Sequence, residues 1–168
     1  MSDTAEAIMD AAERRIRGAG YSGFSFREIA ADVGVKSASV HYHFATKESL
    51  GAAVAHRYTQ RFMSSIEREV AEGRDVIEVW VQAFRRSLYG DGKMCLCGAL
   101  AATSQDLSEE VLIEVRRFFE LGLERLVESG LSQERATHVL ATLEGAMLLA
   151  NVLSRPSAFD EAAAALST

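Results

Sequence analysis

The sequence predicts an all-α protein, in which an N-terminal three-helix helix-turn-helix head is built onto a larger helical body. The 168 residues include one proline and no run of strand-like residues between turn signals, so strands are not expected. Apolar residues recur every three or four positions instead, and small polar or acidic residues precede most of these stretches. We expect the head to span residues 1–46 and the body residues 47–168.

The charge distribution is compatible with nucleic-acid binding, and the hydropathy gives no sign of a membrane protein. The net charge is −6, but the acidic excess lies in residues 61–168, whereas residues 1–60 carry equal numbers of acidic and basic side chains. A neutral head with local basic groups can still contact phosphates. No stretch reaches membrane-spanning length without charge, and residues 1–10 lack the layout of a secretory signal, so we expect a cytoplasmic protein.

The first two helices are bounded by caps and glycines. The first is expected over about Thr4–Arg17 and is followed by a glycine-rich link. Ser25 is a candidate N-cap of the second, and Glu28 three residues later makes a capping-box pattern. This helix is short, because Gly34 supplies a turn after Val33.

The next two helices follow without a linker. The third is expected over about Ser37–Phe44, where Val40 and Phe44 are four positions apart and face inward together. Thr46 is the candidate N-cap of the fourth helix, which continues to about Ala71. The remaining helices are expected over about 75–89, 93–105, 108–130 and 132–155, with a short final helix from residue 157.

The segment 24–44 carries the motif that bears on function. It reads FSFREIAADVGVKSASVHYHF, which is a short capped helix, a glycine turn and a second short helix, the helix-turn-helix plan. Apart from its apolar side, the second of these helices carries small, polar or aromatic hydrogen-bonding residues. Such a surface suits a helix in the major groove of DNA. An ordinary helical hairpin with a polar outer face is the alternative interpretation.

The run from Arg27 to Leu50, REIAADVGVKSASVHYHFATKESL, resembles the N-terminal signature of the TetR (tetracycline repressor) family. The matching elements are the start of the second helix, the Gly34-Val35 turn, Tyr42-His43-Phe44 and Thr46-Lys47-Glu48. The body is similar in length, in helix layout and in the stretch Leu143-Glu144-Gly145-Ala146. The resemblance implies a DNA-binding regulator, most often a repressor that a small effector releases from a palindromic operator.

The resemblance also implies which residues contact DNA. The candidates are Arg27, Lys36, Ser37, Ala38, Ser39, His41, Tyr42, His43 and Lys47. Residues 37–39 open the recognition helix and would face base edges, whereas Lys47 would contact phosphate at the start of a helix, where the helix dipole adds to the attraction. His41 stands where the family usually has a tyrosine, which changes that contact with the DNA backbone.

In this family the body binds a small effector. The apolar residues expected to line such a cavity are Tyr58, Phe62, Trp80, Phe84, Met94, Cys95, Phe118 and Met147. The alternative is that these side chains are packed core. The effector itself is not identified by the sequence.

Cys95 and Cys97 have two interpretations. Free cysteines usually behave as small core hydrophobes, and two that are one residue apart in a helix rarely form a disulfide. Cys95 also resembles the single cysteine with which some TetR-like regulators detect electrophiles or oxidants, which requires a lowered pKa and some exposure. Lys93 and the expected start of a helix would favour the thiolate.

Two wide apolar stripes predict a homodimer through residues of about 108–154. The residues expected at the interface are Val115, Phe119, Leu126, Val139, Leu143, Met147 and Ala150. The family pairs these two helices with their symmetry mates as a four-helix bundle. The alternative is that both stripes belong to the core of one protomer.

The sequence does not indicate an enzyme. It shows no Ser/His/Asp order, no phosphate-binding loop and no helical pair of metal ligands. Two close thiols without further ligands do not make a metal site either. We therefore expect no catalytic residues, no metal and no cofactor.

Overall fold

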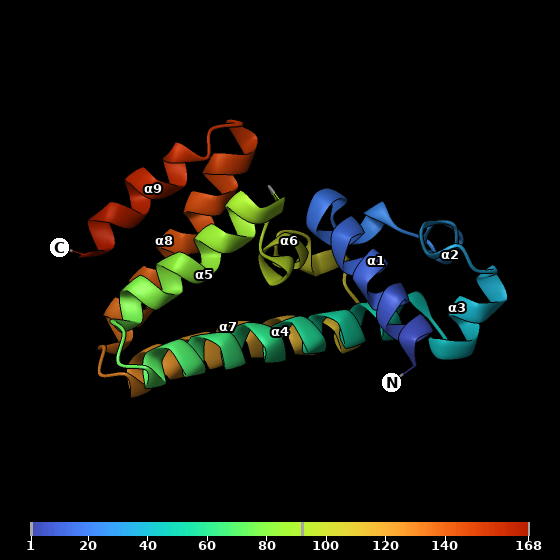
Figure 1. The fold of residues 1–168 in the computed structure, drawn as a ribbon, viewed down its shortest axis with the longest axis horizontal. Coiled ribbons are helices and arrows are strands. Elements are labelled where there is room, and N and C mark those ends of the chain that lie inside the picture. Colours follow the sequence, from blue (N-terminus) through green and yellow to red (C-terminus); the bar gives the residue numbers. More distant parts are fainter. Residues whose placement is uncertain (1, 92, 168) are drawn as a thin grey trace. The chain divides into compact units, whose positions relative to one another are not determined.

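The computed structural model describes residues 2–91 and 93–167, which form nine α-helices and three short 3-10 turns without a strand. The all-α prediction is confirmed (Figure 1). The chain divides into two compact units. Unit 1 comprises Met1–Tyr58 and Leu96–Arg116, and unit 2 comprises Thr59–Cys95 and Arg117–Thr168.

Unit 1 holds the N-terminal helices. They are α1 (Asp3–Ala19), α2 (Phe26–Val33), α3 (Ser37–His43), the first part of α4 (Lys47–Ala71), α6 (Leu96–Ala101) and the start of α7 (Glu109–Glu128). Each of the first four helices begins and ends within two residues of its predicted bounds. Large side chains from α1, α2, α3 and α4 fill the core, among them Ile8, Ile29, Val40 and Leu50, all fully buried.

Unit 2 holds the rest of α4 and α7 together with α5 (Val76–Asp91), α8 (Gln133–Val152) and α9 (Ser157–Ala164). Helix α8 packs against α9 and α5, and Figure 1 shows α8 and α9 joined by a short turn. Trp80, Phe84, Phe118 and Phe159 are fully buried within this unit. In the part of the chain that the structure describes, no helix combines the length and hydropathy that a bilayer crossing requires.

The sixth helix is shorter than the sequence predicts. It spans Leu96–Ala101 rather than 93–105, and a 3-10 turn follows at Ser104–Asp106. At its start, the backbone N–H of Lys93 donates to the Asp91 carboxylate instead of entering a helix. At its end, the N–H and the hydroxyl of Thr103 both donate to the carbonyl of Leu100, which closes the last turn.

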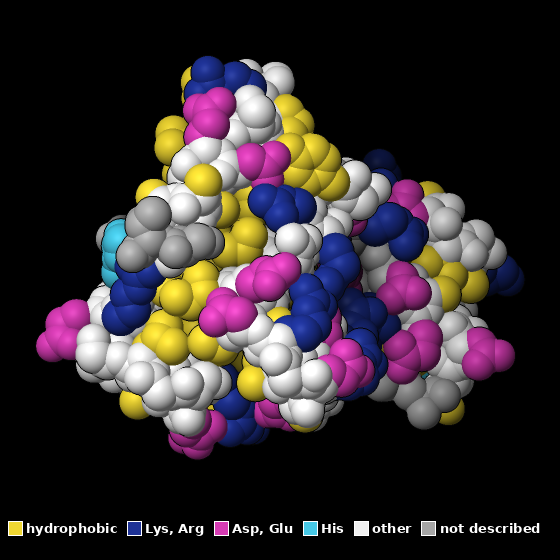
Figure 2. Space-filling model, turned by 60° about the vertical axis from the view of Figure 1, so that its left-hand side comes forward, with side chains coloured by type: hydrophobic (Ala, Val, Ile, Leu, Met, Phe, Trp, Pro, Cys, Tyr) yellow, Lys and Arg dark blue, Asp and Glu magenta, His cyan; other side chains and the backbone are white. Residues whose placement is uncertain are grey.

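Ion pairs fasten α4 to α1 within unit 1. The guanidinium of Arg57 donates to Glu6 at 2.6 Å, to Asp10 at 2.7 Å and to Glu13 at 3.4 Å, and its side chain is only 13% exposed. Three α1 carboxylates thus surround one α4 cation. More widely, acidic and basic side chains are interspersed on the molecular face that Figure 2 shows, an arrangement that favours local pairing.

Arg57→Ala should lower the free energy of unfolding by about 2 kcal/mol, because it removes the cation that pairs with Glu6 and Asp10 between α1 and α4. The matched control is Arg116→Ala, since Arg116 and Glu109 form an exposed pair at 3.6 Å, and the loss there should stay below about 0.5 kcal/mol. Urea titration monitored by circular dichroism measures both. Equal losses in the two variants would contradict this assignment.

Candidate functional site

Local hydrogen bonds fix the start of the helix-turn-helix and the turn between its two helices. The Ser25 hydroxyl accepts a hydrogen bond from the Glu28 N–H at 3.3 Å and donates to the Glu28 carboxylate at 2.9 Å, so the predicted cap is confirmed. Gly34 caps the C-terminal end of α2 with φ of +76°, and the Val35 N–H donates to the Ala30 carbonyl at 2.9 Å. This closure needs a left-handed residue, which is why glycine stands there.

Helix α3 has one buried and one exposed side. Val40 is fully buried and Phe44, directly after the helix, is 8% exposed, so this side packs into unit 1. Tyr42, on the other side, is 86% exposed. A tyrosine ring left this open in water is a candidate contact residue, since aromatic side chains usually lose much of their accessible surface on folding. The ring of His41 lies edge-on against Phe26, with 4.6 Å between centroids.

The residues predicted to contact DNA all lie in unit 1. Arg27 lies on α2, Lys36 directly precedes α3, Lys47 begins α4, and the other six lie on α3. Six are exposed, namely Arg27, Lys36, Ser37, Ala38, His41 and Tyr42, and three are half-buried, namely Ser39, His43 and Lys47. The structure therefore brings the nine into one region with most of them open to solvent. Their contact with DNA stays a prediction.

Aromatic rings position Lys47 at the start of α4. Its ammonium nitrogen lies 4.7 Å from the ring centroid of Tyr21 and 4.5 Å from that of Phe24. Both rings attract the cation through their π faces and restrict its position. Among residues 2–91 and 93–167, no carboxylate forms an ion pair with Lys47, so its charge is available to an external anion.

Acidic charge on α2 is neutralised within the unit. Arg15 of α1 donates from Nε and Nη2 to both carboxylate oxygens of Asp32, at 2.6 and 2.9 Å, and from Nη1 to Glu28 at 3.3 Å. The hydrogen bond from Arg15 lowers the pKa of Asp32 below its usual value. This pairing reduces the repulsion that these carboxylates would exert on a phosphate backbone.

Seven of the eight residues predicted to line an effector cavity belong to unit 2, and Tyr58 belongs to unit 1. The ring of Phe62 lies against those of Trp80, Phe84 and Phe118, with centroids 5.7, 5.5 and 5.4 Å apart. The last three rings are fully buried, so this cluster is packed core. Contact of these residues with an effector stays a prediction.

The Met94-Cys95 segment lies along α8 within unit 2. The side-chain amide of Asn151 donates to the Met94 sulfur at 3.4 Å and to the Met147 carbonyl at 2.9 Å. Cys95 and Cys97 are free and buried, and Cys95 immediately precedes α6 rather than lying inside it. Burial restricts access to both thiols, whereas a reactive sensor thiol needs exposure.

One buried polar group in unit 2, the Glu144 carboxyl, is not among the residues predicted from the sequence. Glu144 of α8 has both carboxylate oxygens shielded from solvent, and within the described residues neither has a conventional hydrogen-bond partner. Burial raises the pKa of this carboxyl to about 7, and the Cys95 thiol, a weak donor, partly opposes the shift. A sequence signal existed, because Glu144 shares the helix face of the buried Leu140 and Met147.

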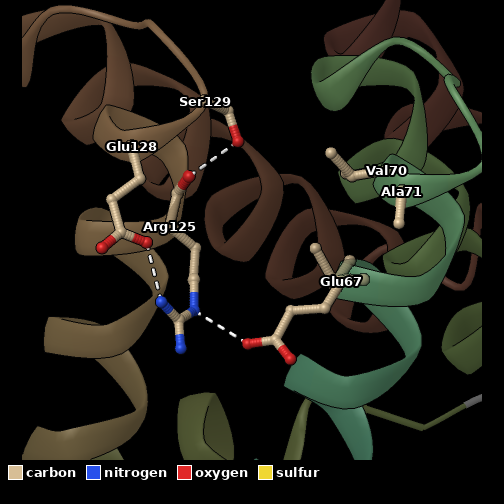
Figure 3. A pocket seen from close by; sticks show the side chains of 7 residues that line it. Glu67, Val70, Ala71, Arg125, Glu128 and Ser129 are labelled. Atoms are coloured by element: carbon tan, nitrogen blue, oxygen red, sulfur yellow. Dashed lines mark hydrogen bonds and ion pairs between the residues drawn. The ribbon is translucent and has the colours of Figure 1, made fainter.

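A groove of about 330 Å³ lies at the ends of α4 and α7 (Figure 3). It is lined by Ile66, Glu67, Val70, Ala71, Arg125, Glu128 and Ser129. Arg125 spans it, with Nε 2.9 Å from Glu67 and Nη1 2.7 Å from Glu128. Its guanidinium is thus already paired with two carboxylates, and the groove is distinct from the predicted effector residues.

The residues predicted at a dimer interface are mostly core residues of the protomer. Val115, Leu126, Val139, Leu143, Met147 and Ala150 are all at most 2% exposed, and Phe119 is half-buried. A different apolar set on and next to α7 and α8 reaches the surface. It consists of Ile113, Val127, Leu148, Leu149, Val152 and Leu153, each at least 37% exposed.

Comparison with known proteins adds independent information on the head. Residues 8–54 match the family model described as "Bacterial regulatory proteins, tetR family". An uncharacterized HTH-type transcriptional regulator of Haemophilus influenzae is 26% identical over 88 residues, which cover 52% of this chain and 47% of that protein. The match thus spans about half the length of this curated relative.

Solved structures match the chain over nearly its whole length. A TetR transcriptional regulator from Legionella pneumophila has a TM-score of 0.90 at 29% identity, covering 99% of this chain and 97% of that one. A TetR-family regulator from Agrobacterium tumefaciens has a TM-score of 0.91 at 25% identity, covering 97% and 95%. The reduced form of NemR from E. coli shares the fold, with a TM-score of 0.84 at 20% identity over 98% and 97%. Residues 8–54 thus carry the N-terminal signature of the TetR family, and the whole chain has the fold of the solved TetR-family transcriptional regulators.

Proposed function

We propose that the chain is a TetR-family transcriptional regulator, which binds a palindromic DNA operator as a homodimer and acts as a repressor that a small effector releases. The observation that carries the DNA-binding part is the exposed side of α3, where Tyr42 is open to solvent while Val40 holds the helix on unit 1. Phosphate contacts from Lys47 and Arg27 would fix the position of the head, and the first turn of α3 would read base edges.

The effector part of the proposal is a two-state mechanism. A dimer reads both halves of a palindrome only when its two heads have the spacing of the groove repeat. An effector that binds better to a conformation with another spacing lowers operator affinity, because a ligand shifts an equilibrium by its difference in affinity. Helix α4 is the proposed connection, since it begins at Lys47 in unit 1 and ends at Ala71 in unit 2.

We place the dimer contact on the exposed apolar side chains of α7 and α8. Leu148, Leu149 and Val152 are 56%, 50% and 72% exposed, and Leu153 directly after α8 is 55% exposed. Apolar side chains that gather along one surface usually mark a protein interface. The buried stripes of the same helices support this surface from within the protomer.

Thiol sensing by Cys95 is the second candidate. Its support is the Glu144 carboxyl, which interacts with the thiol and has a pKa of about 7, so it can accept the thiol proton near neutral pH. Burial of Cys95, which is 1% exposed, opposes reaction with a dissolved electrophile. A non-covalent effector is therefore the proposal that we favour.

Lys47→Gln should weaken DNA binding about tenfold on all sequences and lower the slope of log affinity against log salt by about one, because one phosphate contact is lost. Fluorescence anisotropy with a labelled duplex at several salt concentrations measures both quantities. Arg68→Gln, an exposed cation on the unit 2 part of α4, is the matched control and should bind like the wild type. Identical slopes for both variants would contradict the role of Lys47.

Val152→Glu should convert the dimer to a folded monomer, because it places a charge on an apolar surface that the protomer leaves open. Sedimentation velocity at micromolar concentration measures the mass, and circular dichroism checks that the helices remain. Ala164→Glu on α9 provides an exposed control that should stay dimeric. A charge at Leu143 is a poorer test, since that side chain is fully buried and the protomer would unfold. A Val152→Glu dimer as stable as the wild type would place the interface elsewhere.

A further inference from the structure

The side chain of Glu144 in unit 2 is a buried carboxylate that has no countercharge among the described residues. Glu144 follows the fully buried Leu143 on α8, and Met147, one turn later, is also fully buried. Both oxygens of Glu144 are closed to solvent, and no N–H or O–H group of the described residues donates to them. An isolated carboxylate in an apolar interior is strongly disfavoured, so such a group normally carries a proton or meets a cation.

The cations on the helices packed against α8 are already paired. On α5, Arg85 lies 2.7 Å from Asp160 of α9, and Arg86 lies 2.6 Å from Glu69. Tyr89 of α5 also donates to Asp160, at 2.5 Å. These contacts leave the Cys95 thiol as the polar neighbour of Glu144, and a thiol is only a weak donor.

Arg155, which follows α8, is also engaged, because it lies 3.3 Å from Glu161 of α9. The interior of unit 2 therefore supplies the Glu144 carboxylate with no internal cation among the described side chains. Any cation that stabilises its charged form must therefore come from outside these described side chains.

Aromatic rings lie near the preceding turn of α8. A Cβ built on Gly122 of α7 would lie 3.1 Å from Trp80 Cη2 and 3.3 Å from Leu140 Cδ2. The Trp80 ring and the Leu140 side chain therefore both pack against Gly122. Leu140 is one turn before Glu144. The Trp80 ring stacks on Phe84 with 6.4 Å between centroids, and its Nε1–H has no acceptor within the described residues. A second unsatisfied buried polar atom thus lies in the same unit.

We propose that Glu144 is the recognition group for an effector that carries a protonated amine on an aromatic or apolar body. This inference rests on the proposed effector-responsive function and names the chemical class of the effector. The ammonium group would supply the missing countercharge. The rings around Trp80 are closely packed, so the apolar body would have to displace part of this cluster to lie beside Glu144. An anionic effector would place like charge against Glu144. A metal cation is disfavoured, because the described residues contain no group of three His, Cys, Asp or Glu side chains that could hold one.

The charge on the ligand is tested with a pair of probes of nearly equal size, 1-naphthylmethylamine and the neutral 1-naphthalenemethanol. Isothermal titration calorimetry on the dimeric protein at pH 8 should give at least about tenfold tighter binding for the amine, because only the amine forms a charge-assisted pair. Glu144→Gln should reduce that preference to less than about twofold. Glu134→Gln, an exposed carboxylate on the same helix, should keep it. Equal affinity for the two probes, or no binding of the amine, would overturn the proposal.

Proton release gives a second readout. The pKa of Glu144 is raised to about 7, so at pH 6 most molecules are protonated there and amine binding should release close to one proton, whereas at pH 8 it should release about 0.1. Titrations in buffers of different ionisation enthalpy measure this number. The release should be absent in Glu144→Gln. Release that persists in this variant would also overturn the assignment.

Measurements of thermal stability and of DNA binding distinguish failure of this inference from failure of the proposed function. The folded-state pKa of Glu144 lies above its ordinary value, so the wild type loses stability as the pH rises from 4.5 to 7. The thermal stability of Glu144→Gln relative to the wild type should therefore be higher at pH 8 than at pH 5. The variant should still bind operator DNA but should no longer be released by the amine. If the amine binds through Glu144 without releasing DNA, the site stands and the effector-release mechanism fails. If the protein binds no DNA while the probe preference holds, only the proposed function is overturned.

Discussion

The burial of one side of α3 is the constraint on which the DNA-reading head depends. Val40 and Phe44 pack into unit 1, and this packing turns the opposite side of the helix, with Tyr42, toward solvent. The left-handed residue Gly34 sets the direction in which α3 leaves α2. A helix this short has little stability of its own, so its orientation comes from these contacts rather than from helix propensity.

The charged side chains of unit 1 fall into two groups, those that join helices through ion pairs and those that have no carboxylate partner among the described residues. Arg15 and Arg57 pair with carboxylates of α1 and α2, and these pairs fasten helices to one another. Lys47 is held by two aromatic rings instead, which leaves its charge without a carboxylate partner among the described residues. The net charge of −6 is therefore a poor guide to the head, because many of its acids are already neutralised locally.

Much of the fold could be predicted from sequence, because its signals are local. The Ser25 cap, the Gly34 turn and the four-residue apolar spacing of Val40 and Phe44 each depend on neighbours in the chain. The dimer residues stay a prediction, because periodicity identifies an apolar face but does not say what covers it. The structure buries Leu143 in the protomer and exposes Val152 on the same helix.

The functional groups of the body required three-dimensional information. Glu144 is one carboxylate among many in the sequence, and its importance comes from its lack of a pairing cation among the described residues, since the arginines of α5 are paired with other carboxylates. The three-carboxylate cluster around Arg57 likewise joins residues more than forty positions apart. Resemblance to the family located the head residue by residue, but it could not supply these contacts, since effector-binding bodies differ in the side chains that they bury.

Selection of DNA from a random duplex pool by the wild-type protein, followed by titration of the enriched sequence at 50 to 200 mM salt, tests the central claim most directly. The account predicts a two-fold symmetric sequence, since a homodimer presents two identical heads. It also predicts affinity that falls by orders of magnitude, about 10³-fold or more, over this salt range. No enriched sequence, together with no salt-dependent binding at the lowest salt concentration, would contradict it.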